Sequence, residues 1–300
     1  MRTMLELRNP RSRWIGSRWP AINIAFALAE VVWIIRGRND SAFLNYFNSK
    51  LPLFAGNGNS YHGAYGFRLR HSLGFDQLES AFEALRAKPD SRQVVLQIWD
   101  GNIDFPKNQG EPASKDIPCN VVAMLKLREG RLEWTQIMRS NDFFRGFVHN
   151  IVQFTSLQEI MAGWLGVELG SYHHFSDSLH IYTDNAVEMS KASKCELPQN
   201  TDNLSLSKPQ SDKSFRELES LVEVIISPES TTEQLLKCLD SMKAEPSILN
   251  IARIMACEGL RRRGSKREMD IVLRSCTNQT YSYLFNGWLN RVQFSLERRD

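Results

Sequence analysis

Two β-rich segments of this chain, residues 120–127 and 131–140, are separated only by the tripeptide Arg-Glu-Gly at 128–130. So short a connection, with glycine near its turn, is typical of a hairpin between antiparallel strands. Residues 92–100 are also rich in β-forming side chains, and apolar residues recur at helical spacing over 150–165. The last pattern predicts a central, deeply packed helix. Together these elements favour an α/β fold with a large mixed, twisted sheet and flanking helices.

Two further helices are expected before the hairpin. Apolar residues at helical spacing over 23–37 predict a helix that ends near Gly37, and Glu30 lies inside this apolar segment. An amphipathic segment at 76–87 ends before Pro89, as a helix does ahead of proline. A glutamate inside an apolar helix either caps a neighbouring backbone group or has a chemical role.

The chain changes composition after about residue 190. Residues 191–213 are polar, rich in Ser, Asn and Pro, and lack apolar periodicity, which predicts a linker. Amphipathic helical segments follow it, so we expect a catalytic domain at 1–190 and a small, all-helical C-terminal domain at 214–300.

The helical segment contains a basic stretch, RRRGSKR at 261–267. Basic residues combined with aromatic ones occur in nucleic-acid contacts, and the aromatic residues that follow are Tyr281, Tyr283, Phe285 and Trp288. Cations are also favoured at helix C-termini. We therefore expect a solvated helix end, with nucleic-acid contact left open as the alternative.

Charge and cysteine usage exclude several classes of protein. The net charge is only +3, too balanced to indicate a polyanion-binding surface, and no apolar run approaches the roughly 20 residues of a membrane helix. The N-terminus lacks the apolar core of a secretory signal, so a cytoplasmic location without membrane association is expected. Five cysteines without a CxxC pair argue against disulfides and zinc clusters. We expect no metal site, and a structural role for the neighbouring His173 and His174.

Cys119 differs from the other cysteines in its sequence context. It follows Pro118 at the entry to a predicted strand, and Arg139 lies on the partner strand of the predicted hairpin. A guanidinium near a thiol would favour the thiolate, or it could hold a substrate phosphate. Both uses suit a nucleotide site, although a lone cysteine is more often a small buried apolar residue.

Seven segments between about residues 20 and 190 resemble, in order, the thymidylate synthase family, which includes the nucleotide hydroxymethylases. They are AEVVWIIRG, GAYGFRLR, DQLESAF, PDSRQVVLQIWD, IPCN, QIMRSNDFFRGFVHN and LHIY. The resemblance implies one-carbon transfer from 5,10-methylenetetrahydrofolate to C5 of a pyrimidine nucleoside monophosphate. It also implies a homodimer whose sheets pack face to face.

The resemblance assigns catalytic roles to four residues. Cys119 would be the nucleophile that adds to C6 of the pyrimidine. Glu30 would act as general acid and base through water. Asp142 would contact the pterin of the folate. Asn150 would bind the edge of the base, and its amide can both donate to O4 and accept from N3–H of uracil.

The resemblance also implies residues that bind the nucleotide. Arg139 and Ser140 would bind the phosphate, and His180 and Tyr182, on one face of a strand, would hold the sugar hydroxyl. Arg92 would reach the phosphate of the partner subunit across the homodimer interface. Arg13 or Arg11 would replace the flexible phosphate-binding loop of the family.

Three departures from the synthases bear on the product. Leu69 stands where the synthases have a Trp that covers the reacting carbon at the folate site, and Asn120 stands where they have His. The apolar C-terminal tail that closes over folate is missing. Each change admits water, so we expect hydroxymethylation of a uridylate-type nucleotide. The alternatives are a thymidylate synthase proper, a cytidylate hydroxymethylase, and a non-catalytic protein that binds nucleotide or RNA.

Overall fold

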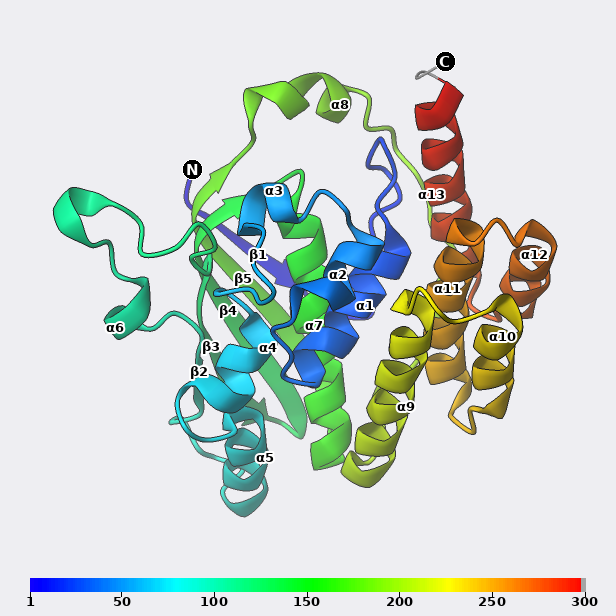
Figure 1. The fold of residues 1–300 in the computed structure, drawn as a ribbon. Coiled ribbons are helices and arrows are strands. Elements are labelled where there is room, and N and C mark those ends of the chain that lie inside the picture. The colour runs from blue at the N-terminus through cyan, green and yellow to red at the C-terminus, as the bar shows by residue number, and fades with distance from the viewer. Residues whose placement is uncertain (298–300) are drawn as a thin grey trace.

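The computed structural model describes residues 1–297, and within them five strands form one sheet (Figure 1). The strands are β1 (Thr3–Leu7), β2 (Val95–Gln97), β3 (Asn120–Arg128), β4 (Arg131–Asp142) and β5 (Glu168–His180). Their order across the sheet is β1-β5-β4-β3-β2; β4 and β5 are parallel and the other neighbours antiparallel. The predicted α/β fold with a mixed sheet is confirmed.

The predicted hairpin joins β3 to β4. Arg128 pairs with Arg131, and between them Glu129 and Gly130 have φ angles of 51° and 72°. Positive φ at both central residues belongs to the tight hairpin turns that match the twist of the flanking strands. This turn fixes the register that places the start of β3 beside the end of β4.

A long helix, α7 (Gly146–Leu165), connects the parallel strands β4 and β5. Parallel neighbours need such a crossover, and α7 packs against both strands with buried residues around most of its circumference. Gly166, with φ of 66°, ends it. The central helix expected over 150–165 is therefore confirmed and begins one turn earlier.

The apolar segment at 23–37 forms α1 (Ile24–Ile35), which packs on α7. Asn23 caps this helix by accepting from the Phe26 amide at 3.1 Å. The segment at 76–87 forms α5 (Gln77–Ala87), capped by Asp76. Shorter elements surround these two helices: α2 (Ser41–Phe47), α3 (Pro52–Ala55), α4 (Tyr65–Phe67), the π-helix η1 (Arg68–Ser72), α6 (Gly101–Asp104), η2 (Asn108–Gly110), η3 (Thr183–Asn185) and α8 (Ala186–Ser190).

Strand β2 is shorter than the β-rich segment 92–100 predicts. The amides of Ile98 and Trp99 both donate to the carbonyl of Val121, at 3.0 and 3.2 Å, where the register of β3 shifts. Two donors on one acceptor interrupt the ladder, and Asp100 then caps α6.

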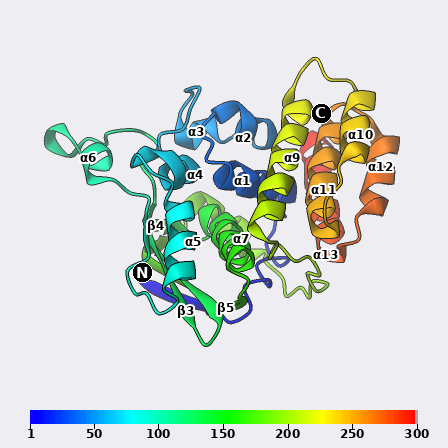
Figure 2. The ribbon, with the colours of Figure 1, turned by 90° about the horizontal axis from the view of Figure 1, so that it is seen from below.

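The C-terminal segment is helical, and Figures 1 and 2 show most of it beside α1 and away from the sheet. Its helices are α9 (Lys208–Ile226), α10 (Thr232–Ser241), α11 (Pro246–Arg262), α12 (Lys266–Ser275) and α13 (Gln279–Glu297). Helix α9 begins inside the predicted linker and packs against α1 and α7. Residues 298–300 of the predicted helical domain lie outside the described residues.

The segment that precedes α9 is fastened to the rest of the fold. The buried Glu159 accepts from the Leu204 amide at 3.1 Å and from Arg11 at 2.6 Å. Asp202 accepts from Asn250 at 2.9 Å. We call residues 195–207 the strap, because its polar groups bind α7 on one side and the C-terminal helices on the other. Within residues 1–297, no helix has the length and apolar character needed to cross a membrane.

Candidate active site

The beginning of β3, the ends of β4 and β5, and the first turns of α7 meet at one end of the sheet. A cavity of about 1600 Å³ opens there, between these elements, α1 and α13. It is lined by five residues that were predicted to be functional: Glu30, Cys119, Asp142, Asn150 and Tyr182. The antiparallel register of β3 and β4 explains how Cys119 and Asp142 reach the same end.

Cys119 immediately precedes β3, and Arg139 holds the loop that carries it. The guanidinium donates from Nε to the carbonyl of Pro118 and from Nη2 to that of Ile117, each at 3.0 Å. Nη2 also lies 4.0 Å from the Cys119 Sγ. Burial raises the pKa of this thiol, and the nearby Arg139 charge only partly opposes the effect, while Asp116 adds to it. The thiol is therefore protonated at neutral pH and needs a base before it can attack.

Glu30 projects from α1 into the cavity. Its Oε2 atom lies 3.1 Å from Nδ1 of His149 on α7, and the two side chains are 13% and 18% exposed. The imidazole ring packs edge-on against Phe26, with ring centroids 5.1 Å apart. Among the described residues no backbone group donates to the Glu30 carboxylate. The Glu30 carboxylate therefore lies beside His149 and faces the cavity.

Asp142 and Asn150 lie at the other side of the cavity. Asp142 Oδ1 accepts from the amides of Phe144 and Arg145, at 2.7 and 2.9 Å, which fixes the turn that starts α7. Its Oδ2 is buried, lies 4.0 Å from Nε of Arg145, and has no hydrogen-bond partner within the described part of the chain. Asn150 donates one amide hydrogen to Gln153 Oε1 at 3.0 Å. The rest of this amide is available to a ligand.

Residues 20–227 of the chain match a family model described as thymidylate synthase. This range covers more than half of the chain, including the cavity residues on α1, β4 and α7, Cys119 before β3 and Tyr182 after β5. The chain belongs to the thymidylate synthase family.

Relatives within the thymidylate synthase family carry two kinds of name. Proteins named deoxyuridylate hydroxymethyltransferase, from Bacillus phage SP01 and Pseudomonas phage M6, are 39% and 38% identical over 193 and 164 residues. These matches cover 61% and 54% of this chain, and 49% and 45% of the relatives. A putative thymidylate synthase from Methanothermobacter marburgensis is 35% identical over 130 residues, 43% of this chain and 55% of that protein. The chain thus spans about half the length of the relatives it matches.

Several residues that the family resemblance assigned to the site do not line the cavity. Arg13 is 3% exposed, and its guanidinium donates to Glu159 and, at 2.5 Å, to Ser156. These contacts hold Arg13 within the fold beside the strap. Leu69 is fully buried in η1, where it supports the core.

Most of the remaining predicted ligands of the nucleotide lie around the cavity rather than in its lining. Ser140 is on β4, and His180 ends β5, where its Nδ1 lies 3.2 Å from the carbonyl of Ser178. Tyr182, which does line the cavity, follows the strand instead of lying on it, with its ring 5.2 Å from that of His180. Arg92 is exposed in the loop before β2.

The cavity contains arginines that sequence reasoning missed. Arg18 donates from Nε to the Phe144 carbonyl at 3.0 Å, and burial together with the Arg291 charge lowers its pKa to about 10. Arg145 donates to Asn185 at 2.7 Å, and Arg291, on α13, donates to the Ala21 carbonyl at 2.7 Å. Arg145 lies within a family segment and could have been found there. Nothing in the local sequence singles out Arg18 or Arg291.

The site also fits a folate. Ligand cavities are commonly ~300–1000 Å³, and a cavity of about 1600 Å³ has room for a nucleotide and a second ligand. The buried Oδ2 of Asp142 is an acceptor that matches an N–H donor of a pterin. The positive charge of Arg18 and Arg145 suits the carboxylates of a folate tail.

Proposed function

We propose that this protein transfers a one-carbon unit from 5,10-methylenetetrahydrofolate to C5 of deoxyuridylate and releases the 5-hydroxymethyl nucleotide. The observation that carries the proposal is a cavity that brings together Cys119, Glu30, Asn150 and Asp142. The phage relatives named deoxyuridylate hydroxymethyltransferase support this choice of substrate and product.

The thiol of Cys119 would begin the reaction. Its sulfur adds to C6 of the pyrimidine, and the electron pair of the C5–C6 double bond moves toward O4, which makes C5 nucleophilic. The raised pKa of the thiol means that its proton must leave as sulfur adds. Glu30 is the cavity carboxylate that can accept and return protons through water.

Asn150 would select the base. With one amide hydrogen held by Gln153, its other hydrogen can donate to O4 and its oxygen can accept from N3–H. Cytosine presents the opposite pattern at these two positions, an amino donor and an unprotonated N3. The arrangement therefore favours uracil.

The folate would lie beside Asp142 and the arginines of the cavity. When bound, it would supply the methylene group at the oxidation level of formaldehyde. Asp142 would orient the pterin through Oδ2, while Arg18 and Arg145 would attract the carboxylates of the tail.

Hydroxymethylation is favoured over methylation because the residues that replace the synthase shield lie away from the cavity lining. Leu69 is buried in η1, and Asn120 is buried in the sheet, where Gln136 donates to it. Helix α13 supplies one wall of the cavity, through residues such as Trp288 and Arg291. Water can then reach the reactive carbon.

The decisive experiment incubates the protein with deoxyuridylate and methylenetetrahydrofolate carrying a labelled methylene carbon. We expect a product heavier than the substrate by one hydroxymethyl group in place of hydrogen, and no near-ultraviolet absorbance rise from dihydrofolate. Cys119→Ala should bind deoxyuridylate and form no product, because the covalent bond is lost while the base contacts remain.

Other outcomes would point to the alternatives. A stoichiometric absorbance rise with a methylated product would identify a thymidylate synthase proper. A preference for deoxycytidylate would identify a cytidylate hydroxymethylase. Binding without turnover would favour a non-catalytic nucleotide-binding protein, and full activity of Cys119→Ala would overturn the mechanism.

A further inference from the structure

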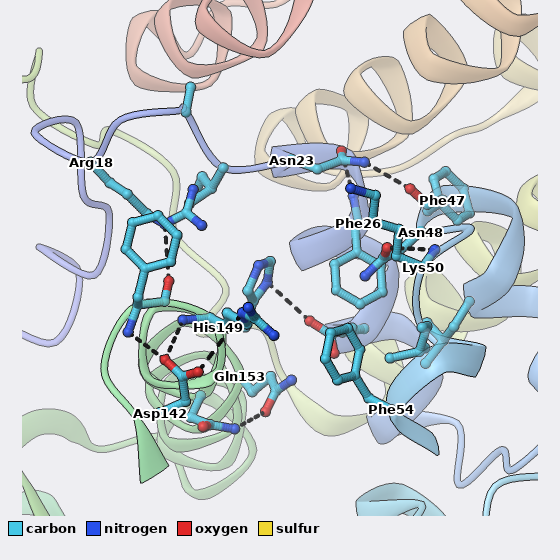
Figure 3. A pocket seen from close by; sticks show the side chains of 18 of the residues that line it. Arg18, Asn23, Phe26, Phe47, Asn48, Lys50, Phe54, Asp142, His149 and Gln153 are labelled. Atoms are coloured by element: carbon cyan, nitrogen blue, oxygen red, sulfur yellow. Dashed lines mark hydrogen bonds and ion pairs between the residues drawn. The ribbon is translucent and has the colours of Figure 1, made fainter. Parts of the chain in front are cut away.

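His149 is a cavity residue to which the family resemblance gave no role. It lies one residue before Asn150 near the start of α7, and its side chain enters the cavity opposite α1. Figure 3 shows it between Asp142 and Phe26. Its Nδ1 lies within ion-pair distance of the Glu30 carboxylate. An imidazole at the centre of a reaction cavity is a group that can take up and release protons near neutral pH.

The two nitrogen atoms of the His149 ring have different surroundings. Nδ1 is buried and lies 3.1 Å from Oε2 of Glu30, in ion-pair distance but without the geometry of a hydrogen bond, and Phe26 packs edge-on against the ring. Nε2 has no hydrogen-bond partner among the described residues. A carboxylate behind one imidazole nitrogen stabilises the imidazolium that forms when the other nitrogen accepts a proton. His149 is thus arranged to accept a proton at Nε2.

We propose that His149, supported by Glu30, is the general base that activates the water for hydroxymethylation. The inference rests on the proposed function and assigns its last chemical step. After the folate has left, the Cys119-bound pyrimidine carries an exocyclic methylene group conjugated to the C4 carbonyl. This group is an electrophile that requires a nucleophile of suitable strength.

The step balances without an oxidant or a reductant. The water oxygen bonds to the methylene carbon while Nε2 of His149 takes the water proton. The electron pair of the exocyclic double bond moves to O4, then returns to form the C5–C6 double bond and breaks the bond between C6 and Cys119 sulfur. The proton on His149 passes to the departing thiolate, whose raised pKa favours the neutral thiol.

Neutral water is a weak nucleophile, so access alone leaves this step slow. A positioned general base accelerates such steps by ~10²–10⁴-fold. The residue next to the nucleophile cannot serve, because Asn120 is buried and bonded to Gln136. Among the residues that line the cavity, His149 is the one that brings an imidazole to it.

Charged and titratable groups from several elements share the cavity with the ring and will shape its pH response. The charged ones are Arg18, Glu30, Lys50, Asp116, Asp142, Arg145, Glu188, Arg262 and Arg291, and the other titratable ones are Cys119, Tyr61, Tyr65, Tyr182 and Tyr283. With both acids and cations present, the pH dependence must be measured by difference between variants rather than read from one profile.

The test separates water activation from all earlier steps. Release of tritium from C5 of labelled deoxyuridylate reports every step through loss of the C5 proton, and formation of the hydroxymethyl product reports hydration. The variants are His149→Gln, which keeps a donor toward Glu30, and His149→Phe, which keeps the packing against Phe26. His71→Gln is the matched control, because His71 is exposed and does not line the cavity.

In a single turnover with enzyme in excess over deoxyuridylate, we expect His149→Gln to keep the rate of tritium release within about threefold of wild type while the rate of product formation falls about 100-fold. The missing fraction should be recovered as a thioether when 2-mercaptoethanol is added, because a thiol attacks the methylene carbon without this base. The wild-type rate of hydration should fall as the pH is lowered, as expected of a step that needs an unprotonated base, and that limb should vanish in His149→Gln. His149→Phe should behave in the same way, and His71→Gln like wild type.

Three results would overturn the inference alone: unchanged product formation in His149→Gln, equal losses of tritium release and product, or the same pH limb in wild type and His149→Gln. The second result would mean that His149 only positions Glu30. A wild-type protein that makes the methylated product would overturn the proposed function, and the inference with it.

Discussion

The reactivity of Cys119 is set by opposing effects on one thiol. Burial raises its pKa, and the guanidinium of Arg139, 4.0 Å away, lowers it by a smaller amount. We predict that alkylation of Cys119 by iodoacetamide is slow at pH 7 and still increases with pH above 9, because only the thiolate reacts. Arg139→Ala should move this profile to higher pH.

Alkylation of Cys119 is measured separately from that of the other cysteines, by mass spectrometry of the peptide that contains it. Cys195, which is half-buried, provides an internal comparison in the same digest. A Cys119 profile that levels off below pH 8 would contradict the assignment of burial as the dominant effect.

The specificity for uracil depends on the amide of Asn150. We predict that Asn150→Asp shifts the preference between deoxyuridylate and deoxycytidylate toward the latter by at least about tenfold in kcat/KM, because a carboxyl group can donate to N3 and accept from N4 of cytosine. Competition between the two nucleotides, with both products quantified, measures the ratio. A wild type that already prefers deoxycytidylate would refute the assignment of uracil.

At the scale of elements, the strap depends on a carboxylate that is completely buried. Burial alone would raise the pKa of Glu159, but Arg13 and Arg11 hold it below its usual range. We predict that Glu159→Gln lowers the free energy of unfolding by ~3–5 kcal/mol at pH 7, because it leaves buried arginine charge without its counter-ion. Urea denaturation measures this, and hydrogen exchange should show faster exchange at the Leu204 amide.

The matched control is Glu168→Gln, whose side chain is 78% exposed and pairs with Arg131 at 3.4 Å. Its effect should stay within ~0.5 kcal/mol. Because the folded-state pKa of Glu159 is depressed, its stabilising contribution is present above the carboxyl's unfolded-state pKa and is lost as the pH falls through the lower folded-state value. Equal unfolding curves for the two variants would contradict the role of Glu159.

The same elements show what the sequence can and cannot predict. Helices α1, α5 and α7 and the β3–β4 hairpin follow from local periodicity and turn residues, and all were expected. The shortness of β2 depends on the carbonyl of Val121, which no local pattern announces. The strap has the composition of a flexible linker, since polar residues that bind solvent and those that bind a buried carboxylate look alike in sequence.

In the candidate site, too, some residues could be predicted from the sequence and others depend on contacts between distant parts of the chain. Cys119, Glu30, Asp142 and Asn150 belong to family segments, so the resemblance alone is enough to single them out. His149 lies within one of those segments too, but its importance comes from Glu30, which is far away in the chain and on another helix. Arg18 and Arg291 meet only because α13 packs against the N-terminal segment.

At the scale of the whole molecule, the sheet has one face that the helices leave uncovered (Figure 2). An apolar row crosses this face, since Val122 pairs with Ile137, Ile137 with Phe175, and Phe175 with Met4. Met4 is 68% exposed, and Val95, on the neighbouring row, is 52% exposed. Such a patch is typical of an interaction surface. We propose that two copies of the chain pack here, sheet against sheet.

If each subunit lends Arg92 to the other's site, two inactive variants should complement each other. We predict that mixing Arg92→Ala with Cys119→Ala, with subunit exchange, gives about a quarter of wild-type activity, because half of the dimers then hold one complete site. Sedimentation should show dimers for both variants and monomers for Ile137→Glu. Absence of recovery on mixing would mean that Arg92 serves its own chain or has no role.

Helix α13 closes one wall of the cavity and reaches back to Ala21 through Arg291. During translation the chain emerges from its N-terminus, and domains begin to fold as they emerge. Glu30, Cys119 and Asn150 can therefore come together early, while the ribosome is still making the C-terminal helices. The cavity gains its last wall only when α13 has been synthesised and has packed against the rest of the fold. A chain on which translation stops early would therefore carry every group of the proposed chemistry, but its binding site would be open to solvent on the side of α13.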